Sequence, residues 1–131
     1  MEKSKIIVID CKKNLRDIAQ YFLSKEGYIV TVVGSGSEAI KLLKKESFNL
    51  VLCNGNLPGA YGSKVIAALI KLKKTPKIGI MKGWTGKLTS LEKGDLDIDF
   101  IARKPFKLSA LLRQISEVIK QDNLYLQTHS I

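Results

Sequence analysis

The stretch that decides the fold is a short apolar run followed at once by a turn-forming loop: Leu50-Val51-Leu52-Cys53, then Asn54-Gly55-Asn56-Leu57-Pro58-Gly59-Ala60-Tyr61-Gly62. Four consecutive apolar residues without alternation are typical of a strand that is buried on both faces of a parallel sheet. The dipeptide Asn54-Gly55 is a strong turn signal, because both residues tolerate the backbone conformations that tight turns need. The stretch therefore predicts a central strand over 50–53 that ends in a loop at Asn54.

Strand and helix patterns alternate along the chain on both sides of this strand. Short apolar runs predict four more strands, over 6–9, 28–33, 78–81 and 100–102. Helical spacing of apolar residues predicts helices beginning near Asn14 and Ser35, over about 63–72, between Gly86 and Gly94, and from Leu108. Five strand–helix units joined by short connections predict an α/β fold with a parallel sheet covered on both faces. The expected architecture is a flavodoxin-like (βα)5 doubly wound sheet with strand order 2-1-3-4-5.

Local signals predict where the helices begin and end. Asn14 with Asp17, and Ser35 with Glu38, have the spacing of capping boxes, and Gly27 suits the end of the first helix. The first helix has one apolar stripe, which is expected to face the core: Leu15, Ile18, Ala19, Phe22 and Leu23. The last helix has another: Leu108, Leu111, Leu112, Ile115, Val118 and Ile119. Residues from 122 onward are polar and are expected to fray. We therefore predict a domain over 1–121 and a tail or linker stub over 122–131.

Composition excludes several classes of protein. The 131 residues suit one domain, and 45% hydrophobic residues suffice for one core. No apolar run approaches the ~20 residues of a membrane span, and no signal peptide is visible, so a cytoplasmic protein that does not enter a membrane is expected. Cys11 and Cys53 are too few and too far apart for a disulfide framework, and both are expected to be small buried residues. His129 is the single histidine and lies in the tail, which argues against histidine catalysis or a zinc site.

Charge is the strongest compositional bias. The net charge is +10, from 22 basic and 12 acidic residues. Such a surface attracts nucleic acid, anionic membranes or acidic proteins. The lysines occur in nearly every predicted element rather than in one block, which favours a solvated surface. No nucleic-acid recognition motif is present, so nucleic acid is not expected as a partner.

Polar residues follow the predicted strands where their carboxyl ends meet. In a sheet with order 2-1-3-4-5, the crevice lies beyond the carboxyl ends of the first and third strands. Asp10 and Cys11 follow the first strand, and Asn54 follows the third. We therefore expect these three residues to meet at one edge of the sheet.

This constellation resembles the phosphorylation site of two-component response-regulator receiver domains (CheY-like), and the resemblance covers nearly the whole chain. The acidic pair after the first strand corresponds to Asp10-Cys11, and the acceptor aspartate, four residues before a proline, to Asn54. The Thr or Ser after the fourth strand corresponds to Lys82, and the Lys-Pro pair after the fifth to Lys104-Pro105. The aromatic residue often found three residues before that lysine corresponds to Ile101. The departures from the family pattern identify a degenerate member, a pseudo-receiver.

The departures also predict that the phosphorylation chemistry is lost. In active receivers, the resemblance implies, Mg²⁺ is held by the carboxylates after the first strand, by the acceptor carboxylate and by a backbone carbonyl two residues beyond it. Mg²⁺ prefers hard oxygen ligands, but Cys11 offers a soft thiol and Asn54 a neutral amide, which is not a nucleophile. One carboxylate, Asp10, faces two ammonium groups, Lys82 and Lys104, where an active site has three carboxylates and one lysine. We expect no enzymatic activity, no catalytic residue, no bound Mg²⁺ or other metal, and no cofactor.

Simpler roles remain open for the same residues. Asp10 either caps the first helix or pairs with Lys104, and Lys104 then holds the loop after the fifth strand. Cys11 is interpreted as a packing residue. Lys82 either reaches into the pocket and substitutes for Mg²⁺ or points to solvent. Asn54-Gly55 serves as a turn in either case.

The leading functional hypothesis is a protein-interaction module that works without phosphorylation. The resemblance implies a docking face on the fourth helix, fifth strand and fifth helix, for a histidine kinase, an output domain or a second copy. The candidate residues on or near this face are Trp84, Lys87, Ile101, Arg103, Lys107 and Arg113. The first alternative is a sensor of small anions or other small molecules, using Lys12, Lys13, Lys82 and Lys104 around the former phosphate position. The second is a conventional receiver with atypical ligands.

Overall fold

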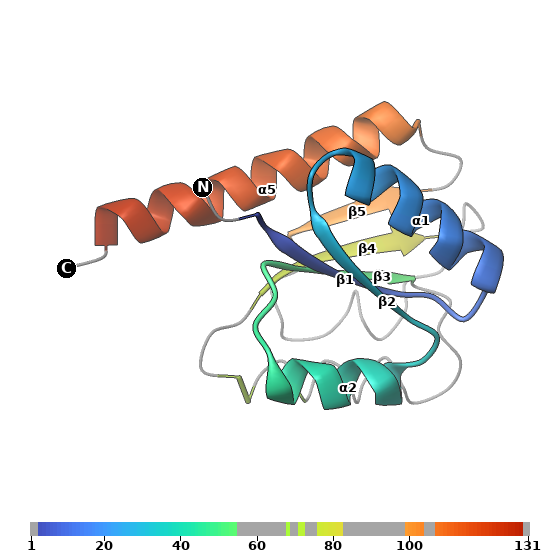
Figure 1. The fold of residues 1–131 in the computed structure, drawn as a ribbon. Helices are drawn as coiled ribbons and strands as arrows, with labels where there is room; N and C mark the ends of the chain where they lie inside the picture. Colours follow the sequence, from blue (N-terminus) through green and yellow to red (C-terminus); the bar gives the residue numbers. More distant parts are fainter. Residues whose placement is uncertain are drawn as a thin grey trace.

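A computed structural model describes residues 3–54, 68, 71–72, 76–82, 99–103 and 107–129. Its five parallel strands form one sheet in the order β2-β1-β3-β4-β5 (Figure 1). The strands are β1 (Lys5–Ile9), β2 (Ile29–Val33), β3 (Leu50–Asn54), β4 (Lys77–Lys82) and β5 (Phe100–Arg103). The predicted strand order is confirmed, and each strand lies within one or two residues of its predicted bounds.

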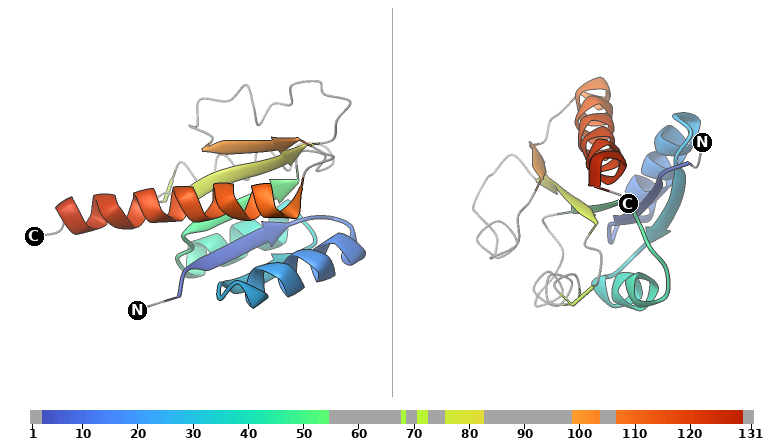
Figure 2. Two further views of the ribbon diagram at one scale, coloured as in Figure 1. Left: turned by 90° about the horizontal axis from the view of Figure 1, so that it is seen from above. Right: turned by 90° about the vertical axis from the view of Figure 1, so that its left-hand side faces the viewer.

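The described helices are α1 (Lys13–Lys25), α2 (Gly36–Lys45) and α5 (Leu108–His129). Figure 2 shows α1 and α5 together on one face of the sheet and α2 on the other. The predicted third and fourth helices, over 63–72 and between Gly86 and Gly94, lie almost entirely outside the described residues. In the part of the chain that the structure describes, no helix is both long enough and apolar enough to cross a membrane.

The apolar strands separate two layers of core. On one side, β-strand residues pack against Ala39 and Leu43 of α2. On the other side, they pack against Leu23 of α1 and against the inner face of α5, including Leu111 and Ile115. All four residues of the run 6–9 are fully buried. Their side chains alternate between the two faces of the sheet, and each face is covered by one of the two core layers. The continuous apolar runs therefore mark strands covered on both faces, as predicted.

The helix ends agree with prediction at some positions only. Ser35 is the N-cap of α2, and its side chain accepts a hydrogen bond from the Glu38 backbone N–H. Gly27 follows α1 with a positive φ of 95°, a conformation that glycine adopts without strain. The predicted cap at Asn14 is wrong: α1 begins at Lys13, its N-cap is Lys12, and no side chain caps it there.

Two other expectations are corrected. The apolar stripe of α1 does not all face the core, because Ile18 is 50% exposed. Residues 122–129 do not fray but continue α5 as helix to His129. The stretch after Lys120 contains no glycine or proline that would stop a helix, so its polar composition alone was a poor sign of an end. The division of the chain into a domain over 1–121 and a tail over 122–131 stays a prediction.

Candidate functional site

The candidate site lies at the carboxyl edge of the sheet, where β1 and β3 end side by side. Ile9 of β1 pairs with Cys53 of β3, so Asp10 and Asn54 are each the next residue along neighbouring strands. Asn54 is the last residue of β3 and pairs with Met81 of β4. The sheet register therefore brings together the two positions that the sequence pattern singled out.

Asp10 is a buried carboxylate, with 2% of its surface exposed. Its Oδ1 accepts a hydrogen bond from the Lys12 backbone N–H at 3.0 Å. Its own backbone N–H donates to the Val33 carbonyl oxygen at 3.1 Å, which ties the end of β1 to β2. Asp10 thus holds the turn that leads into α1, although no side chain caps that helix, and the predicted pairing of Asp10 with Lys104 lies outside the described residues.

Arg16 is a site residue that the sequence analysis missed. Its Nη1 donates a hydrogen bond to the Asp10 backbone carbonyl at 2.9 Å. The guanidinium also lies over Gly34, where an added Cβ would be 3.0 Å from Nη1. The available signal in the sequence was an arginine among lysines at the start of α1. Arginine presents several N–H donors in a rigid fork, whereas lysine presents a compact charge on a flexible stem.

The two cysteines have opposite environments. Cys11 is exposed, so its interpretation as a packing residue is wrong: it lies in the turn beyond the covered part of β1. Cys53 is buried in the core layer beside α2. Burial, together with the negative charge of Asp10, raises the pKa of the Cys53 thiol from 9.0 to about 12.

We expect the free energy of unfolding to fall as the pH rises above 9. The Cys53 thiol keeps its proton in the folded protein up to about pH 12, whereas the unfolded chain releases it near pH 9. Stability from this group is therefore complete below pH 9 and is lost as the pH rises toward 12, by up to about 1.4 kcal/mol per pH unit. Urea unfolding across this range measures the slope.

Cys53→Ala should reduce that slope and Cys11→Ala should not, because Cys11 is already exposed. Burial also raises the pKa of Tyr28, so Tyr28→Phe in the Cys53→Ala background should flatten the slope further. An unchanged slope in Cys53→Ala would contradict the assignment.

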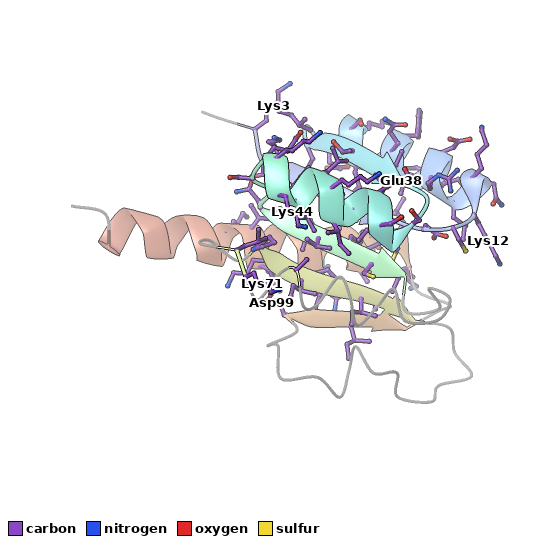
Figure 3. The ribbon with its side chains drawn as sticks, turned by 90° about the horizontal axis from the view of Figure 1, so that it is seen from below. Lys3, Lys12, Glu38, Lys44, Lys71 and Asp99 are labelled. Atoms are coloured by element: carbon purple, nitrogen blue, oxygen red, sulfur yellow. The ribbon has the colours of Figure 1, made fainter. Side chains whose placement is uncertain are left out.

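Exposed lysines occur at both ends of the molecule. Figure 3 shows Lys12 near the start of α1 and Lys44 and Lys71 toward the opposite end of the strands. Both Lys12 and Lys13 are exposed, and the Lys13 Nζ lies 2.9 Å from Asp17 Oδ2 on the next turn of α1. Asp17 therefore pairs with a lysine instead of completing a capping box.

The candidate partner face is described in part. Lys107 and Arg113 are exposed at the start of α5. Ile101 is half-buried and packs against the core layer beside α2. The backbones of Lys82 and Arg103 pair across β4 and β5, but their side chains are not described. Trp84, Lys87 and Lys104 lie outside the described residues.

Comparisons with known proteins agree with this architecture. Residues 6–116 match the family model of the response regulator receiver domain. The chain is 30% identical over 125 residues to the uncharacterized transcriptional regulatory protein YkoG of Bacillus subtilis strain 168, covering 93% of this chain and 54% of the relative. The chain thus spans about half the length of that curated relative.

Solved structures show the same fold. A signal receiver domain from Vibrio parahaemolyticus superposes with a TM-score of 0.83 at 16% identity, covering 99% of this chain and 100% of that domain. The chemotaxis response regulator CheY4 of Vibrio cholerae superposes with a TM-score of 0.74 at 21% identity, covering 89% of this chain and 99% of that chain.

The fold and the strand-end site define a CheY-like signalling domain of the flavodoxin-like class. The chain belongs to the response-regulator receiver-domain family of two-component signalling. Domains of this family are in general signalling modules rather than enzymes.

Proposed function

We propose that this chain is a receiver domain that acts as a protein-interaction module without being phosphorylated. The observation that carries the proposal is Asn54 at the end of β3, beside the buried carboxylate of Asp10. The family resemblance assigns phosphoryl transfer to a carboxylate at the position of Asn54. A carboxamide has no nucleophilic oxygen of that kind, so an acyl phosphate cannot form there.

The donor set is also a poor fit for Mg²⁺. Asp10 Oδ1 is occupied by the Lys12 backbone N–H, and the neighbouring Cys11 supplies a thiol where the family has a hard oxygen. The sequence adds a lysine at position 82 to the lysine that the family already has, which is Lys104 here. At an effective dielectric near 20, two unit charges about 5 Å apart interact by roughly 3 kcal/mol, and a divalent cation doubles that repulsion from each lysine.

Without phosphorylation, a partner must select the conformation of the domain by its own differential affinity. The exposed Lys107 and Arg113 at the start of α5 give this face a positive charge, which favours an acidic surface on the partner. The partner classes that suit a receiver are a histidine kinase, an output domain or a second copy of the chain.

We expect Mg²⁺ titration to produce no saturable change in the amide NMR spectrum below millimolar concentration. The physical reason is the loss of two hard oxygen ligands at Cys11 and Asn54. The matched variant Cys11→Asp with Asn54→Asp restores both and should gain a saturable site whose shifts centre on residues 10–12. Saturation of the unmodified chain below millimolar Mg²⁺ would contradict the proposed function.

A further inference from the structure

An apolar cavity of about 120 Å³ lies between α1 and α5, directly behind Asp10. Its floor is formed by Leu52 of β3 and Met81 of β4. Figures 1 and 2 show why the space arises: α1 and α5 lie on the same face of the sheet. Among the described residues, the walls contain one polar residue, Asp10, and are otherwise apolar: Leu15, Ile18, Ala19, Phe22, Leu23, Leu108 and Leu111.

The cavity opens to the surface between the two helices. Two of its lining residues are among the exposed large hydrophobic residues: Ile18 is 50% exposed and Leu108 is 36% exposed. Deeper lining residues such as Leu52 and Leu111 are buried. A molecule can therefore enter past Ile18 and Leu108 without displacing the central core.

The small side chain of Ala19 helps to leave this space empty. Ala19 lies on the apolar stripe of α1 and packs against the core layer beside α5. Protein interiors contain few voids larger than a water molecule, because wall atoms without neighbours lose dispersion contacts. An apolar cavity of about 150 Å³ in another protein stays dry and binds benzene, which sets the size of a suitable occupant.

We propose that this cavity binds a compact, mainly apolar molecule that carries an N–H donor, such as a small benzylic amine or an indole. The apolar walls take a small ring system, and the Asp10 carboxylate in the lining accepts the hydrogen bond of the N–H group. A ligand with its own carboxylate is excluded, because it would bring a second negative charge beside a buried one.

The cavity connects ligand binding to the strand-end site. Asp10 lines the cavity and also holds the Lys12 backbone N–H at the entry to α1. A ligand that bonds to Asp10 therefore stabilises the β1–α1 turn, where receivers carry their chemistry. The inference does not depend on whether Asn54 accepts a phosphoryl group.

The test is a titration followed by methyl NMR of the isoleucine and leucine side chains. The probes are benzylamine and benzoate, which share one six-membered ring and differ in the polar group, and indole, which has a fused ring system and a neutral N–H group. We expect benzylamine and indole to shift the methyl resonances of Leu15, Ile18 and Leu108 in a saturable manner. Benzoate should bind at least about tenfold more weakly, a difference of about 1.4 kcal/mol.

Two variants separate cavity binding from surface binding. Ala19→Met fills the space and should weaken binding of benzylamine and indole at least about tenfold while raising the thermal midpoint. Gln20→Met places the same side chain on the exposed face of α1 and should leave both affinities unchanged. Asp10→Asn should remove the preference for benzylamine over benzoate but leave the binding of indole in place.

Three results would overturn the proposal: no saturable methyl shift with any probe, equal binding of benzoate and benzylamine, or unchanged binding in a folded Ala19→Met variant. The amide spectrum of each variant shows independently that it is folded. The proposed function stands in all three cases, because it is tested by Mg²⁺ and by a phosphodonor.

Discussion

Acetyl phosphate is expected to leave the wild-type chain unmodified, whereas the double variant Asn54→Asp with Cys11→Asp should acquire one phosphoryl group. The wild-type chain has a carboxamide at the end of β3, and its oxygen does not attack phosphorus. The double variant restores an acceptor carboxylate and the second carboxylate after β1, which together would hold Mg²⁺, and the cation would neutralise the charge on the transferring oxygens. Intact-protein mass spectrometry after treatment with acetyl phosphate and Mg²⁺ measures the difference, which should be close to all or none.

The single variants show how much of the gain in phosphorylation comes from the nucleophile at position 54 and how much from the Mg²⁺ ligand at position 11. Asn54→Asp alone should be modified slowly, because the thiol of Cys11 is a poor Mg²⁺ ligand. Cys11→Asp alone should remain unmodified, because it still lacks a nucleophile at 54. Since Asn54 precedes glycine and is prone to deamidation, peptide mass spectrometry must first confirm that the wild-type amide is intact. A stable acyl phosphate on intact wild-type chain would refute the inactive-receiver proposal.

The sequence predicts the sheet well because its strands are covered on both faces. Residues 6–9 and 50–53 are buried almost completely, so every position in each run had to be apolar. The strand ends then bring Asp10 and Asn54 to one edge through the sheet register alone. Local pattern and topology thus suffice to place the backbone of the site.

Contacts that depend on three-dimensional packing could not be predicted from the same patterns. Asn14 has the spacing of a cap, but the Asp10 carboxylate already bonds to the Lys12 backbone N–H, and α1 begins one residue before Asn14. Arg16 bonds to a backbone carbonyl, for which the sequence has no periodic signal. The half-exposed position of Ile18 likewise follows from how α1 sits beside α5, because helical spacing identifies a stripe but not how closely it is covered.

Gly79→Ala is expected to give the largest loss of stability of the substitutions considered. Gly79 of β4 pairs with Phe100 of β5, and the Phe100 ring lies across the place where a Cβ would project. An added Cβ would lie within 2.6 Å of Phe100 Cε1 and 2.7 Å of Cε2, closer than carbon atoms approach without displacement. Because the residue is buried between two strands, the ring or β5 must move. Overpacking of this kind costs about 1–3 kcal/mol, measured as the free energy of unfolding in urea.

Two comparisons show whether the ring is the cause of that loss. Gly34→Ala adds the same methyl group, but its nearest neighbour is the end of the flexible Arg16 side chain at 3.0 Å, so a smaller loss is expected. Phe100→Leu removes the ring and should recover part of the stability in the Gly79→Ala background, although it is destabilising alone because Phe100 packs against the core layer beside α5. The two substitutions should therefore be strongly non-additive, as residues in contact are. Additive losses, or a Gly79→Ala variant as stable as the wild-type chain, would show that β5 does not depend on the ring that covers Gly79.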